Sequence, residues 1–237
     1  MRSAINERIS RRTFEKSPLS TNEQEKIIQM VEKSNARSGL SSEFLEDGSA
    51  AFDSIKKSYG MFKNARSLLL MKGEKNDVHL LEKVGYYGEE LVLDLTDMKL
   101  GTCWVAGTFD KTQFTAPDSE EIVCVILVGK VSNVTPKEKL IRYAISKNRK
   151  PISKRLIATA EVPDWVVKGI ESVRLAPSAR NTQKTTFHYD GNTLTVNIPN
   201  DYPMDLVDLG ISKKHFEIEA NGKFELGNGA TFQMSKI

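Results

Sequence analysis

Hydrophobic residues recur every three or four positions in several stretches of the chain, which is the spacing of amphipathic helices. The clearest pattern predicts a helix over about residues 77–99, and Gly101 has the place of its C-terminal stop. Further helices are predicted at about 4–9, 21–34, 136–145, 163–175 and 201–220. Ser20 and Glu23 have the spacing of a capping box, so the second of these helices begins next to Ser20.

Short, continuously apolar runs predict buried strands between these helices. In the first part of the chain they cover 67–71, 102–106 and 121–129. Later, 186–189 and 193–198 flank Asp190-Gly191-Asn192, which is typical of a β-hairpin turn. Strand-like pieces at 223–226 and 231–234 close the chain, whereas residues 41–63 carry no clear pattern and predict only weak structure.

The order of predicted elements begins again after residue 150, which suggests an internal duplication. A shift of 143 positions places six identical residues over 29 aligned positions, where average residue usage gives roughly two by chance. Among them, Arg12 falls on Arg155 and Ile27 falls on Ile170. We therefore predict two diverged halves, a first lobe over 1–150 and a shorter second lobe over 151–237.

Composition narrows the class of protein. The chain has 237 residues and a net charge of +3, with basic residues scattered among acidic ones. This argues against a nucleic-acid or membrane partner, since such a partner needs a denser basic face. The N-terminus has no apolar signal region. Cys103 and Cys124 lie in apolar segments and fit a reduced compartment, so we expect the cytoplasm, and the three scattered histidines show no metal-ligand spacing.

Two basic clusters could bind an anion. Arg11-Arg12-Thr13 offers two guanidinium groups and a hydroxyl, which suit a phosphate or a ribityl chain, although a solvated basic turn would have the same sequence. Lys147 and Arg149 flank Asn148, and in an extended segment both cations would point to one side. They could grip one phosphate or belong to an ordinary linker, and the sequence favours neither.

Two further segments could contact a flat ligand. Residues 101–109 are small, apolar and bounded by glycines, so backbone N–H groups at Val105, Ala106 and Gly107 could approach a ring closely. A packed turn around a buried tryptophan is the alternative. Residues 174–187 join a helix to a strand, and Pro177 should end that helix.

The segment after Pro177 combines small side chains with side-chain amides. Ser178 and Ala179 would let the backbone approach a flat partner, and Asn181 and Gln183 could read the edge of a heteroaromatic ring. An ordinary helix-to-strand loop can hold the same residue types.

The sequence contains no recognisable nucleophile or acid–base pair. There is no Gly-x-Ser-x-Gly elbow, no Walker loop and no Gly-x-Gly-x-x-Gly. Glu89, Glu90 and Asp94 fit the solvated face of the long helix. We therefore expect no catalytic side chain and no metal, and infer that a cofactor supplies the chemistry.

Taken together, these clusters resemble the FMN-dependent nitroreductase family, in the branch whose single chain mimics the usual dimer. The matches stand in the family's order: Arg11-Arg12-Thr13 for Arg-Arg-Ser, residues 100–109 for the segment beside the flavin ring, Lys147-Asn148-Arg149 for the Lys-x-Arg of the FMN phosphate, and residues 176–183 for Ala-Pro-Ser-x-x-Asn-x-Gln.

The resemblance implies an α+β fold, with a mixed sheet flanked by helices and two diverged halves forming a pseudo-dimer. In the ordinary family one subunit gives the arginine and phosphate contacts and its partner gives the Pro-Ser loop. The first half here would give Arg11, Arg12, Thr13, Val105, Ala106, Gly107, Lys147 and Arg149, and the second half Pro177, Ser178, Ala179, Asn181 and Gln183. The first half's own loop at 33–38 lacks Pro-Ser, which predicts one FMN site per chain.

The implied activity is an FMN-dependent oxidoreductase that takes hydride from NAD(P)H on flavin N5 and passes it to a nitroaromatic, a quinone or a similar acceptor. The implied assembly is a monomer acting as a pseudo-dimer. The alternative is a non-catalytic or degenerate flavin-binding protein. It is motivated by that changed loop and by Glu15, which stands where the family often has a cation, with Lys16 beside it.

Overall fold

The computed structural model describes residues 2–53 and 60–235. The chain divides into two compact units, each built from separate segments. Unit 1 comprises Met1–Asn6, Leu81–Glu90 and Ala144–Ile237, and unit 2 comprises Glu7–Leu80 and Leu91–Tyr143. Helix α4 (Leu80–Asp97) and helix α5 (Pro136–Lys147) contribute residues to both units.

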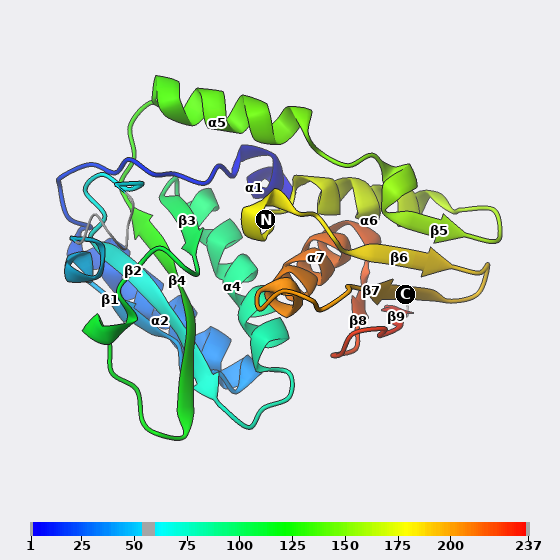
Figure 1. Ribbon diagram of the computed structural model, residues 1–237, viewed down its shortest axis with the longest axis horizontal. Coiled ribbons are helices and arrows are strands. Elements are labelled where there is room, and N and C mark those ends of the chain that lie inside the picture. The colour runs from blue at the N-terminus through cyan, green and yellow to red at the C-terminus, as the bar shows by residue number, and fades with distance from the viewer. Residues whose placement is uncertain (1, 54–59, 236–237) are drawn as a thin grey trace. The chain divides into compact units, whose positions relative to one another are not determined.

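Unit 2 is organised around an antiparallel sheet whose strand order is β1-β2-β4-β3 (Figure 1). The strands are β1 (Glu43–Leu45), β2 (Ser67–Glu74), β4 (Glu120–Gly129) and β3 (Gly101–Val105). The central strands β2 and β4 are almost fully buried, as the apolar runs predict. Their side chains form the core of unit 2 together with Phe14 and Phe109.

Helix α2 (Thr21–Ser38) begins as the sequence predicts. The Ser20 side chain accepts the Glu23 backbone N–H, and the Glu23 carboxylate accepts the Ser20 backbone N–H at 2.7 Å, so both halves of the capping box are present. The helix ends at Gly39, whose φ of 73° lies in the left-handed region that favours glycine. Buried Ile27 and Val31 define the inner face of α2.

Unit 1 holds helices α6 (Asp164–Leu175) and α7 (Asp205–Ala220), which pack side by side. Its strands are β5 (Leu156–Ala158), β6 (Thr186–Tyr189) and β7 (Leu194–Asn197), in the order β5-β6-β7, and the hairpin β8 (Gly222–Phe224) with β9 (Phe232–Met234). The Asp190 carboxylate accepts the N–H groups of Asn192 and Thr193 in the predicted hairpin turn. Contacting aromatic rings fill the core: Trp165, Phe187, Phe216, Phe224 and Phe232.

The two halves repeat one connectivity, which confirms the predicted duplication. A bridge between Thr195 and Thr231 links β7 to β9, so the antiparallel order β6-β7-β9-β8 reproduces β1-β2-β4-β3. Helices α2 and α6 begin 143 positions apart, and so do strands β1 and β6. The boundaries of the two compact units differ from the predicted boundary between the halves, because residues 81–90 cluster with the second half. The lobe boundary at residue 150 stays a prediction.

Two glycines let α4 and α7 cross closely within unit 1. A Cβ on Gly85 would lie 2.0 Å from the Val207 carbonyl oxygen, and a Cβ on Gly210 would lie 2.0 Å from the Glu82 carbonyl oxygen. Each glycine is the sixth residue of its helix. The crossing therefore has approximate two-fold symmetry in its backbone.

Charges at this crossing are not symmetric. Buried Lys213 of α7 pairs with Glu82 of α4, and Lys214 pairs with Glu90 at 2.6 Å. The His215 ring lies 2.9 Å from the Glu89 carboxylate, and both side chains are fully buried. The sequence placed Glu89 on a solvated face, which is wrong, because α7 covers that side of the helix.

Some element boundaries differ from the predictions for local reasons. Helix α4 ends at Asp97, and Lys99 takes the left-handed conformation with φ of 64°, so Gly101 does not serve as its stop. Gly101 instead opens β3, where a Cβ would lie 2.2 Å from Val131. Residues 41–63 contain β1 and the short 3-10 helix Ser49–Phe52, and 54–59 lie outside the described residues.

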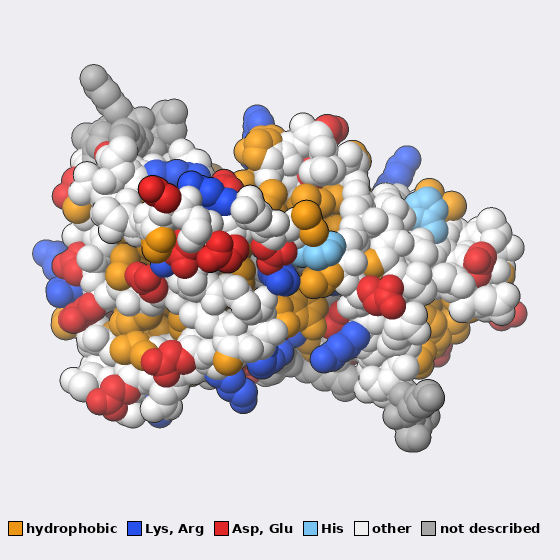
Figure 2. Space-filling model, turned by 90° about the horizontal axis from the view of Figure 1, so that it is seen from below, with side chains coloured by type: hydrophobic (Ala, Val, Ile, Leu, Met, Phe, Trp, Pro, Cys, Tyr) orange, Lys and Arg blue, Asp and Glu red, His pale blue; other side chains and the backbone are white. Residues whose placement is uncertain are grey.

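The surface carries no dominant charge of one sign on the face seen in Figure 2, where acidic and basic side chains are interleaved. Cys103 and Cys124 are free and buried, as their apolar surroundings predict. Within the described residues, no helix is long and apolar enough to cross a membrane.

Candidate functional site

The segment that follows α6 forms a tight, irregular loop in unit 1, and we call residues 176–183 the Pro-Ser loop. Helix α6 ends at Leu175, just before Pro177, as the sequence predicts. Arg180, Asn181 and Gln183 all have φ between 52° and 57°. Non-glycine residues rarely adopt such values, and a cluster of them is typical of functional segments held by their surroundings.

Hydrogen bonds to two side chains, those of Ser178 and Asp208, hold this loop in place. The Ser178 hydroxyl accepts the Gln183 backbone N–H at 3.1 Å. The Asp208 carboxylate on α7 accepts the Ala179 backbone N–H, with oxygen distances of 2.9 and 3.0 Å. Burial raises the pKa of Asp208 to about 7; the Ala179 N–H opposes this shift, and the nearby charge of Asp205 adds to it. Pro177, Ser178, Ala179 and Asn181 remain half-buried.

The structure brings the Pro-Ser loop against the predicted phosphate cluster, and we call residues 147–150 the basic segment. The Gln183 Oε1 accepts the Lys150 backbone N–H at 2.9 Å, and the Gln183 Nε2 donates to the Asn148 carbonyl at 3.1 Å. The Lys150 ammonium donates to the Gln183 carbonyl at 3.0 Å. One buried side chain thus joins two segments that lie more than thirty residues apart.

The basic segment is not extended. The expectation that Lys147 and Arg149 point to one side of an extended segment is therefore wrong. Helix α5 continues through Lys147, two residues beyond its predicted end, and Asn148 and Arg149 form the turn after it. Lys147 is exposed and Arg149 is half-buried. Their nearness to the Pro-Ser loop therefore follows from Gln183, not from strand geometry.

Further cations surround this point, and the sequence patterns did not indicate them. Arg155 is buried and donates to the Gln183 Oε1 at 3.1 Å, and the Arg174 Nε donates to the Lys150 carbonyl at 3.1 Å. Burial lowers the pKa of Arg155 to about 10, and the charges of Arg149 and Arg174 add to the effect. Burial also lowers the pKa of Lys150, with Arg155 and Lys184 contributing.

In unit 2, the segment that carries Arg11, Arg12 and Thr13 is fixed by Glu138. This buried carboxylate accepts the backbone N–H groups of Arg12 at 2.8 Å and Thr13 at 3.1 Å, and the Arg11 Nε at 3.3 Å. Burial by itself would raise the pKa of Glu138, but the hydrogen bonds from Arg12, Thr135 and Thr13 outweigh it and lower the pKa to about 2. The Arg11 guanidinium is therefore engaged by Glu138 and by the Ser132 carbonyl.

The predicted ring-contact segment lies next to residues 11–13. The Arg11 backbone N–H donates to the Thr102 carbonyl at 2.8 Å, which attaches this segment to β3. Beyond the end of β3 at Val105, Ala106 is half-buried and Gly107 is exposed. A Cβ on Gly107 would meet nothing within 4 Å, so its backbone has an open face. A cavity of about 240 Å³ opens beside Arg12 and Thr13, between residues 60–63 and the start of α5.

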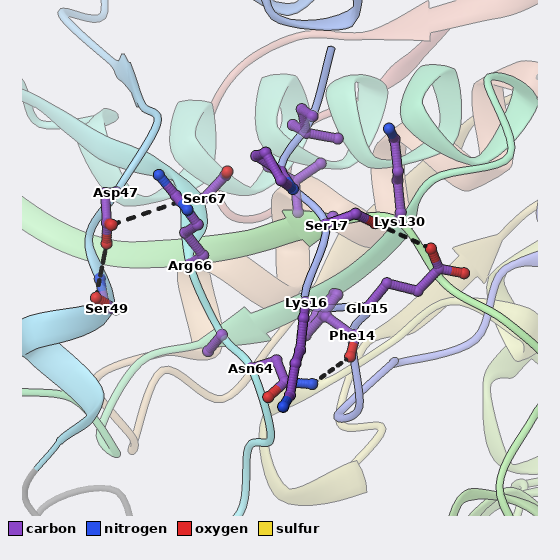
Figure 3. Close-up of a pocket in the computed structure, with 15 residues that line it drawn as sticks. Phe14, Glu15, Lys16, Ser17, Asp47, Ser49, Asn64, Arg66, Ser67 and Lys130 are labelled. Atoms are coloured by element: carbon purple, nitrogen blue, oxygen red, sulfur yellow. Dashed lines mark hydrogen bonds and ion pairs between the residues drawn. The ribbon is translucent and has the colours of Figure 1, made fainter.

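A second cavity in unit 2, of about 300 Å³, holds none of the predicted site residues (Figure 3). Glu15 and Lys16 line it, and both are exposed. The Glu15 carboxylate accepts the Ser17 hydroxyl at 3.2 Å, and the Asn64 amide donates to the Phe14 carbonyl at 2.8 Å. Figure 3 shows Lys16 beside Asn64 at one side of the cavity.

At the position equivalent to the Pro-Ser loop, the first half is helical. Ser34 stands at the position equivalent to Pro177 under the 143-residue shift, and there α2 continues as a helix through Ser38. The Ser38 hydroxyl donates to the Ser34 carbonyl at 2.8 Å. The sequence treated this segment as a degenerate loop, which is wrong: without proline, the helix is not interrupted.

The comparisons with known proteins agree with this architecture. The family model described as "Putative TM nitroreductase" matches residues 1–220. The chain belongs to this nitroreductase family. A solved structure from Thermotoga maritima, described in similar terms, covers 97% of this chain and 90% of its own, with 23% identity and a TM-score of 0.63. That similarity confirms the predicted nitroreductase-like α+β fold, and one solved chain spans both halves, as the pseudo-dimer prediction requires.

Other solved nitroreductases match less of the chain. An FMN-dependent nitroreductase from Clostridium difficile covers 57% of this chain and 90% of its own, with 17% identity and a TM-score of 0.47. A protein of the family from Desulfovibrio desulfuricans, solved in complex with FMN, covers 58% and 92%, with 18% identity and a TM-score of 0.44. No protein with a curated description matches the sequence.

Proposed function

We propose that this nitroreductase-family chain is an FMN-dependent oxidoreductase that takes electrons from NAD(P)H and reduces a nitroaromatic, a quinone or a similar acceptor. The observation that carries the proposal is the junction at Gln183, which unites the basic segment and the Pro-Ser loop. These two motifs are the ones that the resemblance assigns to the FMN phosphate and to the flavin contact.

The residues present fit a flavin phosphate. Arg149, Lys150, Arg155 and Arg174 gather near Gln183, and the buried Arg155 Nε has no hydrogen-bond partner among the described residues. A dianionic phosphate is the kind of group that such a cluster of positive charge attracts. The Pro-Ser loop offers the half-buried Pro177, Ser178 and Ala179 for contact with a ring.

The bound FMN would supply the hydride chemistry, and the protein would supply binding and electrostatics. Lys147 and Arg149 would hold the phosphate. Thr13 and Arg12 line a cavity and would contact the ribityl chain or ring edge, and the open backbone at Gly107, with Val105 and Ala106, would face the ring. Arg11 would act indirectly, through the segment at 11–13 that Glu138 holds in place. We propose that the chain works as a cytoplasmic monomer that acts as a pseudo-dimer.

The alternative is a flavin-binding protein without turnover. Its support is Glu15, an exposed carboxylate hydrogen-bonded to Ser17 where the family often has a cation. A cation there would favour the negative charge of a reduced ring, whereas a carboxylate opposes it. This alternative therefore predicts FMN binding with slow or absent reduction by NAD(P)H.

A visible absorption spectrum of the purified chain tests the proposal. We expect the flavin absorption band after incubation with FMN and desalting, bleaching when NADH or NADPH is added without oxygen, and recovery when a quinone follows. A bound band that neither nucleotide bleaches supports the alternative. Protein that retains no FMN at all contradicts both.

Removing the phosphate contacts tests the site. The double variant Lys147→Ala with Arg149→Ala should bind FMN about 100-fold more weakly or worse, because two charge-assisted contacts are lost. The matched control, Lys26→Ala with Lys33→Ala, removes two exposed cations from α2 and should leave FMN affinity unchanged. Titration of FMN fluorescence measures both, and equal affinity in all three proteins would refute the assignment.

A further inference from the structure

Arg155 is placed by the backbone in a position that hides its side chain. It follows the short 3-10 helix Ile152–Lys154, and its N–H donates to the Ile152 carbonyl at 2.7 Å. Its carbonyl accepts the Phe187 N–H at 2.7 Å, next to the parallel pairing of β5 and β6. The residue is only 2% exposed, so its charge lies in the interior of unit 1.

This buried charge has no acidic partner among the described residues. The Arg155 guanidinium donates to the neutral Gln183 amide, and its Nε has no partner. The charged groups that act on it are Arg149 and Arg174, both of its own sign. Burying an unpaired guanidinium costs several kcal/mol, which is normally offset by a counter-ion.

Nearby carboxylates are already committed to other cations. Glu171 pairs with Arg174 at 2.5 Å on the surface of α6. Asp201 and Asp205 pair with Lys184. Among the described residues, no ion pair therefore balances the charge of Arg155, and an anion from outside the chain would supply the missing partner.

Gln183 transmits the position of Arg155 to the basic segment. Its Oε1 accepts from both the Arg155 guanidinium and the Lys150 N–H, while its Nε2 donates to the Asn148 carbonyl and to the Asn181 Oδ1, each at 3.1 Å. The side chain is 5% exposed and its amide is fully engaged. It is thus poorly placed to read a ring edge, the role that the sequence suggested for it.

We propose that Arg155 and Gln183 are positioning residues for a phosphate-monoester site. Gln183 holds the basic segment in place through hydrogen bonds, and the buried Arg155 beside Gln183 supplies positive charge. The inference rests on the proposed function, under which that monoester is the phosphate of FMN. It adds two residues that never need to touch the ligand. The proposal also gives Gln183 a different role from Asn181, for which contact with the ring stays a prediction.

Comparing FMN with riboflavin, which lacks the phosphate, tests this role. Arg155→Gln keeps a donor for Gln183 but removes the charge, and it should lower FMN affinity about tenfold while riboflavin affinity is unchanged. Arg155→Lys restores a charge and should recover part of the loss. Gln183→Leu should also lower the affinity for FMN more than the affinity for riboflavin, because the basic segment loses its hydrogen bonds to Gln183. Arg142→Gln, an exposed arginine of α5, is the matched control.

A merely structural role gives a different result. If Arg155 and Gln183 only stiffen the fold, their variants change FMN and riboflavin affinity equally, or change only the thermal midpoint, and the proposal is overturned. Circular dichroism checks that each variant folds. Should Arg155→Gln fail to fold, Arg155→Lys and Gln183→Leu carry the same comparison.

Inorganic phosphate separates this proposal from the flavin proposal. If the wild-type chain binds neither FMN nor riboflavin, the proposed function fails. Phosphate should then still raise the thermal midpoint of the wild type, relative to chloride at equal ionic strength, and do so less in Arg155→Gln. Absence of both the FMN preference and the phosphate effect refutes the anion site.

Discussion

Asp208 shows how one buried carboxyl group can link the Pro-Ser loop to pH. Both of its oxygens accept the Ala179 N–H, yet burial raises its pKa to about 7 from 3.8. The folded protein therefore holds this proton up to about pH 7, whereas the unfolded chain releases it near 3.8. Since the folded state binds more protons between these values, the stability contributed by Asp208 falls as pH rises through that window.

We expect Asp208→Asn to remove this pH dependence. The amide oxygen can still accept the Ala179 N–H, and no charge forms in the interior. The variant should be more stable than the wild type above pH 7, by about 2 kcal/mol or more, with the difference vanishing towards pH 4. Urea unfolding across this range measures it. Asp118→Asn, at an exposed position, should show no such trend, and a constant difference for Asp208→Asn would contradict the linkage.

At the scale of elements, the α4–α7 crossing depends on two glycines. An alanine at Gly210 would place its Cβ 2.0 Å from the Glu82 carbonyl oxygen, a distance that only helix separation can relieve. We expect Gly210→Ala and Gly85→Ala each to lower the free energy of unfolding by about 3 kcal/mol or more. Gly107→Ala is the control, because its Cβ meets nothing within 4 Å. Denaturant unfolding measures the free energy of unfolding of each variant. Near-equal values for all three variants would contradict the close crossing.

Local sequence signals predicted most elements, because they act within a few residues. The capping box at Ser20, the stop at Pro177 and the hairpin turn at Asp190 all formed as expected. Boundaries failed where no local residue decided them, as at Lys99, which takes a conformation that glycine usually supplies. The extension of α5 through Lys147 is a similar case.

The candidate site was only partly predictable, since its support comes from residues distant in the chain. The motifs indicated the basic segment and the Pro-Ser loop, and the structure brings these two together. Nothing local marks Glu138 as the acceptor of N–H groups more than 120 residues away, or Arg155 as the neighbour of Gln183. Glu89 looked solvated for the same reason, because its partner, His215, lies on another helix.

At the scale of the whole molecule, the crossing of α4 and α7 pairs opposite charges. Its acids, Glu82 and Glu90, come from α4, and their partners, Lys213 and Lys214, come from α7. Two copies of α4 facing each other would oppose acid to acid, so the arrangement favours pairing within one chain. This supports the proposed monomer.

A charge exchange tests that specificity. Lys213→Glu should destabilise the chain by roughly 3–5 kcal/mol, because it leaves Glu82 buried beside a like charge. Adding Glu82→Lys restores opposite charges and should recover a large part of the loss, whereas adding Glu25→Lys, at an exposed site on α2, should not. Urea unfolding of the wild type, of the single variants Lys213→Glu and Glu82→Lys, and of their double variant gives the coupling energy. Additive effects in the double variant would show that the pair is not specific.

The same crossing has a consequence for biosynthesis. Residues 81–90 of α4 leave the ribosome long before α7, which supplies their partners in unit 1. At usual elongation rates the interval is on the order of ten seconds. During that time Glu82 and Glu89 face water, and their charges keep the first turns of α4 hydrated while unit 2 can already begin to close. We expect these acids to keep this part of α4 hydrated in the nascent chain, until α7 emerges with Lys213 and Lys214.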